Sequence, residues 1–182
     1  MSLLSCYCHL FFGADKEMEV AAKTIRKLTG VSLEKSVAII RSAFGKVADE
    51  LGITVENAPM FPAFITLERL EEMRARGAIF FGLFINGSQV GVVAVEKEAD
   101  GEYYLKRLAV LPDYWHGGLG RELVNFIIDY VRKLGVKKLY LGMVNEHKVL
   151  KEWYLSMDFK EISLKRFEHL PFTVCYMALD IS

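Results

Sequence analysis

The sequence predicts an α/β chain of the α+β type, with a mixed, mostly antiparallel central sheet flanked by helices. Two observations carry this prediction. Strand-like and helix-like segments interleave along the 182 residues in the order βααβββαβαββ. The three middle strands are joined by short turns, which favours an antiparallel meander. Apolar residues make up 52% of the chain, which is enough for the core of one domain.

The first half of the chain is expected to form one strand and two helices. In chain order, the expected elements are a strand over 19–29, an amphipathic helix over 33–51, a loop over 53–65 and a charged helix over 66–76. Ser32 is the expected N-cap of the first helix, and Gly52 marks its end. The loop holds two prolines, and Met60, Phe61 and Phe64 in it look exposed.

The second half is expected to begin with a β-hairpin, because Asn86-Gly87 separates the apolar runs IFFGLFI and QVGVVAVE. The elements that follow are a strand over 102–111, a helix from about 120 to 134, a strand over 138–144, a helix over 147–156 and strands over 160–164 and 172–180. Pro112 ends the first of these strands, and Gly135 ends the long helix.

The charges of the chain cancel. Lysine plus arginine and aspartate plus glutamate each number 23, so the formal net charge is zero. Nucleic-acid binding needs a basic surplus, so we expect no nucleic-acid partner. Cys6, Cys8 and Cys175 lack the spacing and the histidine pair of a zinc site, so we expect no metal. Free thiols favour a reducing, cytoplasmic location.

Residues 1–17 are expected to form an apolar extension in front of a single domain over 18–182. No basic residue precedes the apolar run and no small-residue cleavage site follows it, which argues against a signal peptide. A run of about ten residues is too short to span a membrane, and we expect no membrane partner. Three roles stay open for the extension: an extra strand, a contact in a homodimer, or sequence added to the natural chain.

The most specific local pattern is RLAVLPDYWHGGLGREL over residues 107–123. A strand ends at Pro112, glycines follow at 117, 118 and 120, and a long helix begins. Unpaired N–H groups and the helix dipole favour an anion there, so the loop is a candidate pyrophosphate site. It is no Walker A loop or dinucleotide fingerprint, because Arg121 and Leu123 stand where these require lysine and glycine. On the residues alone, a tight packing turn stays an equal alternative.

This stretch resembles the acetyl-CoA-binding motif of the GNAT superfamily of N-acetyltransferases. That motif runs from Val-x-Pro at a strand end to Gln/Arg-x-x-Gly-x-Gly/Ala at a helix start. Here Val110-Leu111-Pro112 is followed by Trp115-His116-Gly117-Gly118-Leu119-Gly120. Trp115 departs from the glutamine or arginine of the family, which removes a polar contact but leaves the backbone N–H groups.

A second GNAT-like pattern lies further along the chain. The strand LYLGMVN ends at Asn145, and Trp153-Tyr154 in the next helix precedes Asp158-Phe159. Asn145 precedes Tyr154 by nine residues where the family commonly has seven, and Asp158 replaces the usual glycine. The element order also matches, so the resemblance extends from the first strand to the last and implies the GNAT acyl-CoA N-acyltransferase fold.

The resemblance implies an enzyme, an N-acetyltransferase that moves an acetyl group from acetyl-CoA to a primary amine of a small molecule or protein by direct attack. Tyr154 would be the catalytic residue that gives a proton to the departing thiolate. A backbone N–H near Leu108 would polarise the thioester carbonyl. The residues implied in cofactor binding are Leu108, Ala109, Val110, Trp115, His116, Gly117, Gly118, Leu119, Gly120, Arg121 and Asn145.

The base that would deprotonate the amine stays open. The alternatives are Glu96, Glu102, Glu146, His147 and a chain of water molecules. The acceptor is expected against residues 49–69, with residues 165–173 as a further wall. A different function also stays open, a non-catalytic acyl-CoA-binding or sensory module on the same fold, because Trp115 and Asp158 depart from the family pattern.

Overall fold

The computed structural model of the chain describes residues 22–98 and 100–181. Seven strands form one sheet in the order β1-β2-β3-β4-β5-β7-β6, and only the β4–β5 pair is parallel. The strands are β1 (Lys23–Lys27), β2 (Ile79–Ile85), β3 (Ser88–Lys97), β4 (Tyr103–Val110), β5 (Lys138–Val144), β6 (Lys160–Arg166) and β7 (Thr173–Asp180). The α-helices are α1 (Glu34–Leu51), α2 (Leu67–Ala75), α3 (Leu119–Lys133) and α4 (Lys148–Leu155). The predicted fold class and element order are confirmed.

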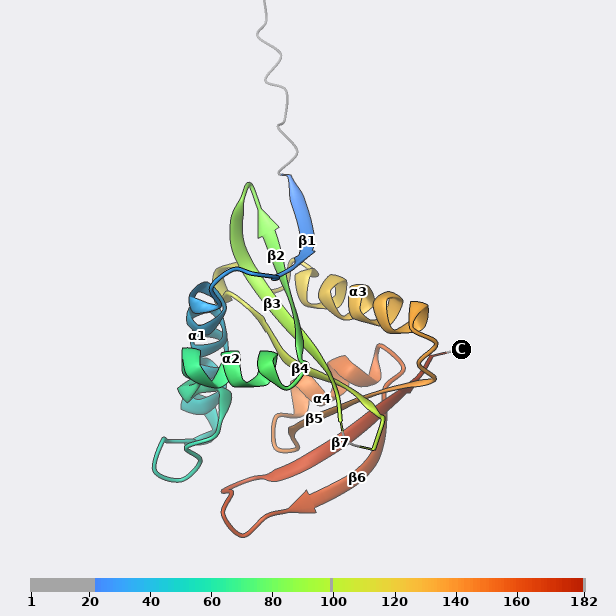
Figure 1. The fold of residues 1–182 in the computed structure, drawn as a ribbon. Coiled ribbons are helices and arrows are strands. Elements are labelled where there is room, and N and C mark those ends of the chain that lie inside the picture. Colours follow the sequence, from blue (N-terminus) through green and yellow to red (C-terminus); the bar gives the residue numbers. More distant parts are fainter. Residues whose placement is uncertain (1–21, 99, 182) are drawn as a thin grey trace, which may run out of the picture.

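Helices cover both faces of the sheet (Figure 1). On one face, α1 and α2 pack in a cluster that includes Ile40, Leu70 and Phe80. On the other face, α3 and α4 pack in a cluster that includes Leu123 and Tyr154. Fully burying an aliphatic side chain of this size contributes about 1.5–3 kcal/mol, so these two clusters hold the layers together.

The Asn86-Gly87 turn forms as the sequence predicts. Asn86 has φ 49° and Gly87 has φ 79°, the positive values that a two-residue hairpin turn requires at both positions. Ile85 pairs with Ser88 across the turn. The local twist of this turn matches the twist of the strands, which sets the register of β2 and β3.

Some element ends differ from the prediction. β1 begins at Lys23 and ends at Lys27, and residues 19–21 lie outside the described range. The N-cap of α1 is Leu33, not Ser32, whose hydroxyl oxygen accepts the N–H of Glu34 at 3.2 Å. β6 continues to Arg166, because this residue pairs with Thr173 of β7. Pairing between distant residues decides such ends, and local sequence does not show it.

Phe61 is buried, which corrects the expectation that it is exposed. Its ring packs edge-on against Phe44 of α1 and Phe172 next to β7, with centroid distances of 5.8 Å in both pairs. Edge-to-face aromatic pairs of this kind are favourable. Met60, in contrast, is exposed as expected. Both partners of Phe61 are remote in the sequence, so the loop composition alone could not predict this burial.

Several expectations fall on residues that the structure does not describe. The extension over 1–17, with Cys6 and Cys8, lies there, so the domain boundary stays a prediction. Cys175 is a free, buried thiol. Over 22–98 and 100–181, no group of three His, Cys, Asp or Glu side chains could hold a metal ion. Within the same ranges, no helix has the length and apolar character needed to cross a membrane.

The parallel strands β4 and β5 pair over a short distance. Only Tyr103 with Leu139 and Tyr104 with Tyr140 form pairs, and beyond them the ladder stops. A β-bulge also interrupts β4 on its other side, between the pairs Val92–Ala109 and Ala94–Lys106. Bulges bend a strand and re-aim its side chains. The second halves of β4 and β5 therefore border an opening in the middle of the sheet.

Candidate active site

A cavity of about 920 Å³ lies at this opening between β4 and β5. On the side of α1 and α2 its walls include Phe44 and Met73, and on the side of α4 they include Leu150 and Tyr154. Residues 104–108 of β4 and 141–144 of β5 line the part between. Because α4 lies on the opposite face of the sheet from α1 and α2, the cavity connects the two faces. It can bring together two molecules that enter from opposite sides.

The second half of β4 presents a free backbone edge to this cavity. Ala109 and Val110 are buried and pair with β3 on one side, whereas on the other side the described part of β5 gives them no pair. Leu108 lines the cavity itself. An extended amide chain can pair with a free strand edge. Leu108, Ala109 and Val110, which the resemblance implies in cofactor binding, are thus available for contact with an extended amide chain.

The glycine loop points a row of donors outward. Gly118 is the N-cap of α3, with φ 79° and no side chain capping the helix. The N–H of Glu122 is the first that bonds inside the helix, to Gly118 O at 3.1 Å. Within the described residues, the N–H groups of 116–121 have no acceptor. This row of donors at a helix N-terminus fits a pyrophosphate.

Close packing explains why glycine stands inside the first turn of α3. A Cβ on Gly120 would lie 3.4 Å from the ring of Trp153 on α4. A Cβ on Gly117 would lie 3.6 Å from Tyr114 O, which is an ordinary contact. Leu119 points into the core. The start of α3 is therefore pressed against α4, and its backbone stays open toward solvent.

Trp115 fastens the glycine loop to β4. Its indole N–H donates to Val110 O at 2.7 Å. The indole replaces the polar side chain that the motif usually has at this position, and its hydrogen bond is made within the protein. We infer that this bond positions the loop relative to the β4 edge. The sequence pattern alone indicated only the loss of a polar contact.

Replacing Trp115 by phenylalanine should weaken acetyl-CoA binding about 2- to 10-fold. The aromatic ring is kept and one hydrogen bond is lost, and such a bond contributes about 0.5–1.5 kcal/mol. Isothermal titration calorimetry with acetyl-CoA measures the change. Tyr114→Phe is the matched control, since no hydrogen bond of the Tyr114 side chain to a described residue would be lost. Equal affinity of Trp115→Phe and wild type would show that the bond does not position the loop.

Arg121 and Asn145 make contacts within the protein. The guanidinium of Arg121 donates to Ser156 Oγ at 2.9 Å at the end of α4, so its backbone N–H faces the loop while its charge lies at α4. The Oδ1 atom of Asn145 accepts a hydrogen bond from Lys151 at 2.9 Å. The structure therefore gives these two side chains partners other than a cofactor.

Tyr154 is buried at the α4 end of the cavity, which it lines. Its ring packs edge-on against Trp153 and Phe159, with centroid distances of 4.9 and 5.5 Å. Burial raises the pKa of the Tyr154 hydroxyl far above its ordinary value. The hydroxyl therefore keeps its proton over the neutral range and can donate a hydrogen bond to negative charge that forms in the cavity.

The four residues that are candidates for the base differ in whether they line the cavity. Glu96 and His147 line the cavity, whereas Glu102 and Glu146 are not among the described residues that do. Burial acts to raise the pKa of Glu146, but hydrogen bonds from Thr173 hold it below its ordinary value. Glu102 accepts the hydroxyl of Tyr104 at 3.4 Å. A hydrogen bond between Glu102 and Tyr140, together with burial and the charge of Glu102, raises the pKa of Tyr140 to about 12.

His147 is constrained as a base by its role as N-cap of α4. Its Nδ1 atom accepts the N–H of Leu150 at 3.1 Å. The neutral imidazole must then carry its proton on Nε2, so this nitrogen can donate but cannot accept. Taking up a second proton at Nδ1 would break the cap. Glu96 is the other candidate that lines the cavity, and taking up a proton would weaken its contacts with Lys106 and Arg76.

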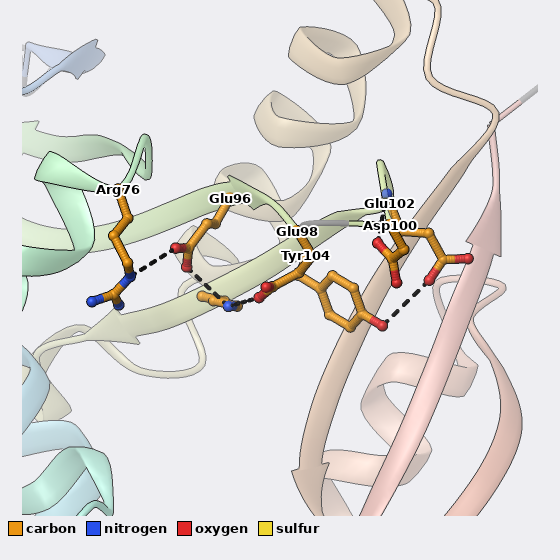
Figure 2. Close-up of polar contacts among 7 residues, drawn as sticks. Arg76, Glu96, Glu98, Asp100, Glu102 and Tyr104 are labelled. Atoms are coloured by element: carbon orange, nitrogen blue, oxygen red, sulfur yellow. Dashed lines mark hydrogen bonds and ion pairs between the residues drawn. The ribbon is translucent and has the colours of Figure 1, made fainter.

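A mixed row of charges lies along β3 and the start of β4 (Figure 2). The buried carboxylate of Glu96 accepts from Lys106 Nζ at 2.9 Å and lies 3.8 Å from Arg76 Nε. Lys106 also pairs with Glu98. Asp100 completes the acidic side chains among the described lining residues. These charges make one wall of the cavity polar, while the wall from α1 is apolar.

A sequence model of the acetyltransferase (GNAT) family matches residues 49–159, which is more than half of the chain. The chain belongs to the GNAT family. The matched segment contains β4, the glycine loop, β5 and Tyr154, which are the parts that form the cavity and its cofactor side. GNAT enzymes are acyltransferases that use acetyl-CoA as the acetyl donor, and this is the chemistry that membership implies for the chain.

Two curated GNAT relatives show how far the similarity extends. The [ribosomal protein bS18]-alanine N-acetyltransferase of Escherichia coli (strain K12) is 34% identical over 107 residues, 56% of this chain and 71% of that protein. The probable N-acetyltransferase camello of Xenopus laevis is 29% identical over 116 residues, 60% of this chain and 53% of that protein. The chain thus spans about half the length of camello.

Solved GNAT structures share the fold over nearly the whole chain. The ribosomal-protein-S18-alanine N-acetyltransferase from Escherichia coli has a TM-score of 0.71 at 25% identity, covering 88% of this chain and 95% of that one. The PaiA N-acetyltransferase from Thermoplasma acidophilum, in complex with coenzyme A, also has a TM-score of 0.71, at 20% identity, covering 87% and 99%. These likenesses support the GNAT fold.

The GNAT spacing between strand and tyrosine points to His147 as well as Asn145. His147 precedes Tyr154 by seven residues, which is the commoner interval, and it caps α4. Asn145 lies at the interval of nine and pairs with Lys151. His147 is thus the N-cap of α4, a role that the sequence pattern did not predict.

Sequence reasoning missed the cationic side chains of this GNAT cavity. The described lining includes Arg69, Arg76, Lys106 and Arg107. Two of them, Lys106 and Arg107, lie in β4 before the glycine loop. Which side of a strand faces a cavity after a bulge depends on the bulge, and no local pattern here predicted it.

Proposed function

We propose that this protein acetylates a primary amine that binds on the α1–α2 side of the cavity, with acetyl-CoA bound on the α3–α4 side. One observation carries the proposal: the cavity passes through the sheet and joins the free edge of β4 and Tyr154 to the opposite face. An amine bound in this passage can reach the acetyl group of acetyl-CoA while each molecule stays on its own side of the sheet. The amine can then attack the thioester directly, without a covalent intermediate on the enzyme.

The residues that would hold acetyl-CoA are on the α3–α4 side. The N–H groups of residues 116–121 would bind its pyrophosphate, and the β4 edge at 108–110 would pair with its amide arm. When bound, acetyl-CoA supplies an activated acetyl thioester. A backbone N–H near Leu108 would stabilise negative charge on the acetyl oxygen as it develops. These donors are backbone groups, so the departure at Trp115 does not remove them.

Tyr154 is the proposed acid. In the transfer, the N–C bond to the acetyl group forms, the C–S bond breaks, and the amine loses one proton while the sulfur gains one. A free thiol has a pKa of about 8.5, below that of tyrosine, so the hydroxyl donates a hydrogen bond to the departing sulfur, and after the proton has moved the tyrosinate takes up another from water. For the proton lost by the amine, we propose Glu96 or water in contact with it. Glu96 is buried in the cavity wall and oriented by Lys106.

The proposal also covers the substrate, the assembly and the location of the protein. The similarity to a [ribosomal protein bS18]-alanine N-acetyltransferase supports an amine of a protein as the substrate, whereas the apolar wall of the cavity supports an amine of a small molecule. Both stay proposals, as does a homodimer. A cytoplasmic location is proposed from the thiols of the sequence and is supported by the free thiol of Cys175.

The protein is expected to bind acetyl-CoA and to release free thiol in the presence of a primary amine. Calorimetry measures binding, and a thiol reagent measures turnover over a panel of small amines and peptides with free N-termini. Binding without turnover on every amine would replace the enzyme by a non-catalytic acyl-CoA-binding module. Absence of binding would overturn both functions. Omitting the amine is the control for slow hydrolysis of the thioester.

A further inference from the structure

Arg107 occupies an unusual place in the cavity wall. It lies at the β-bulge of β4 and has φ 55°, in the left-handed region that residues other than glycine rarely adopt. Its side chain lines the cavity. Backbone strain of this kind persists where surrounding structure imposes it, and it clusters at ligand-binding positions. The bulge thus places Arg107 in the wall of the space where the acceptor would bind.

The guanidinium of Arg107 lacks a counterion of its own. Its Nε atom is buried without a hydrogen-bond partner, and no ion pair among the described residues includes Arg107. The acid whose charge acts on it is Glu96, and that carboxylate already contacts Lys106 and Arg76. A cation that is largely removed from water and left unpaired is costly, so its position calls for an anion.

A second arginine adds to this positive region. Arg69 also lines the cavity, and its guanidinium donates to Met60 Sδ at 2.6 Å, a weak acceptor. Burial lowers the pKa of Arg107, and the charge of Arg69 lowers it further, while Glu96 acts in the opposite direction. The two guanidiniums therefore carry like charge on the same cavity. One anion between them would remove both the repulsion and the unpaired charge.

We propose that the acceptor amine also carries a carboxylate, which Arg107 binds with help from Arg69. This inference rests on the proposed acetyl transfer and names the substrate class for it. The planar fork of a guanidinium matches the two oxygens of a carboxylate. The apolar side chains of Phe44 and Phe61 on the same cavity suit an apolar body. A free aromatic or aliphatic amino acid has all three groups, and so does a peptide N-terminus with an acidic residue beside it.

The first test compares acceptors that differ only in the carboxylate. Wild-type kcat/KM for L-phenylalanine should exceed that for phenethylamine about 10- to 100-fold, the effect of a hydrogen-bonded charge pair. The peptide pair Ala-Asp-Phe-amide and Ala-Asn-Phe-amide tests the second source of the same chemistry. A preference for L-phenylalanine over phenethylamine identifies a free amino acid as the acceptor. A preference for the aspartate peptide over the asparagine peptide identifies an acidic peptide as the acceptor. Equal rates within both pairs would overturn the proposal while leaving acetyl transfer in place.

The second test removes the guanidinium. Arg107→Gln should reduce the preference for the carboxylate acceptor to about twofold or less, and Arg69→Gln should reduce it in part. Arg132→Gln, on the surface beside Asp129, is the matched control and should keep the wild-type ratio. Acetyl-CoA affinity by calorimetry confirms that each variant is folded. An unchanged ratio in folded Arg107→Gln would overturn the proposal.

A binding experiment tests the carboxylate site even if no amine is turned over or if Arg107→Gln fails to fold. Calorimetry of the wild-type protein saturated with coenzyme A compares N-acetyl-L-phenylalanine with N-acetylphenethylamine, which differ in the carboxylate alone. Tighter binding of the carboxylate compound by about 10-fold or more supports the proposal. Equal or weaker binding overturns it. Failure of every amine in turnover, with this preference present, would contradict the proposed acetyl transfer and not the carboxylate site.

Discussion

Replacing Tyr154 by phenylalanine is expected to lower kcat for acetyl transfer about 100- to 10,000-fold, the range for loss of a general acid. Acetyl-CoA affinity should stay nearly unchanged, because the ring keeps its packing against Trp153 and Phe159. Only the hydroxyl is lost, and this group has no hydrogen bond to a described residue that phenylalanine would break. Steady-state kinetics and calorimetry measure the two quantities separately.

Tyr130→Phe is the matched control for this substitution. Tyr130 lies on α3, stacks edge-on against Phe81 and is not among the residues that line the cavity. It should keep the wild-type kcat. A Tyr154→Phe variant with an equally unchanged kcat would contradict the assignment of Tyr154 as the acid, and water would then have to protonate the thiolate.

The pH profile of the wild type gives a second view of Tyr154. Burial raises its pKa, so the folded protein holds the proton at every pH below that raised value. The acid form is thus present from pH 7 to about 10, the ordinary tyrosine pKa. We expect no alkaline loss of kcat from Tyr154 in this window. Should such a loss occur in wild type and vanish in Tyr154→Phe, the hydroxyl would not be buried as described.

Replacing Gly118 by aspartate should weaken acetyl-CoA binding about 100-fold or more. A carboxylate at the N-cap of α3 would accept the N–H groups that are open in the structure and would repel the pyrophosphate. Losing two hydrogen bonds to a charged group costs about 3–6 kcal/mol, which exceeds a factor of 100. An aspartate N-cap favours the helix, whereas the positive φ disfavours it, so stability should change little.

Gly135→Asp separates this effect from backbone strain. Gly135 has φ 76°, close to the 79° of Gly118, and a Cβ would meet nothing within 4 Å at either position. The two substitutions therefore impose the same strain and the same charge at opposite ends of α3. Calorimetry should show wild-type acetyl-CoA affinity for Gly135→Asp. Equal loss in both variants would assign the effect to strain, and no loss in either would contradict the pyrophosphate site.

The parts of the site that the sequence predicted are contiguous in the chain. The glycine loop from His116 to Gly120 follows a strand and begins a helix, so its donors depend on neighbouring residues alone. The same holds for the Asn86-Gly87 turn, where two residues set the backbone. Tyr154 was recognisable only through its family-like neighbour Trp153, because a buried aromatic by itself predicts nothing more than packing.

The parts that the sequence missed arise from contacts between remote segments. Phe61 is buried because Phe44 and Phe172 meet it, and neither lies near it in the chain. Trp115 finds its partner in the backbone of Val110, which depends on how the loop folds back on β4. The sequence shows that Phe61 and Trp115 are aromatic, but it does not show which residues they contact.

The sequence by itself determined the order of strands and helices, the antiparallel meander, the glycine-rich start of α3 and the family resemblance. These follow from periodicity, turn chemistry and capping, which act over a few residues. Only the tertiary structure decided that β4 and β5 separate after two pairs, that a cavity crosses the sheet there, and that the bulge places Arg107 in its wall. Strand pairing and burial join residues far apart in the chain, so they depend on the whole fold.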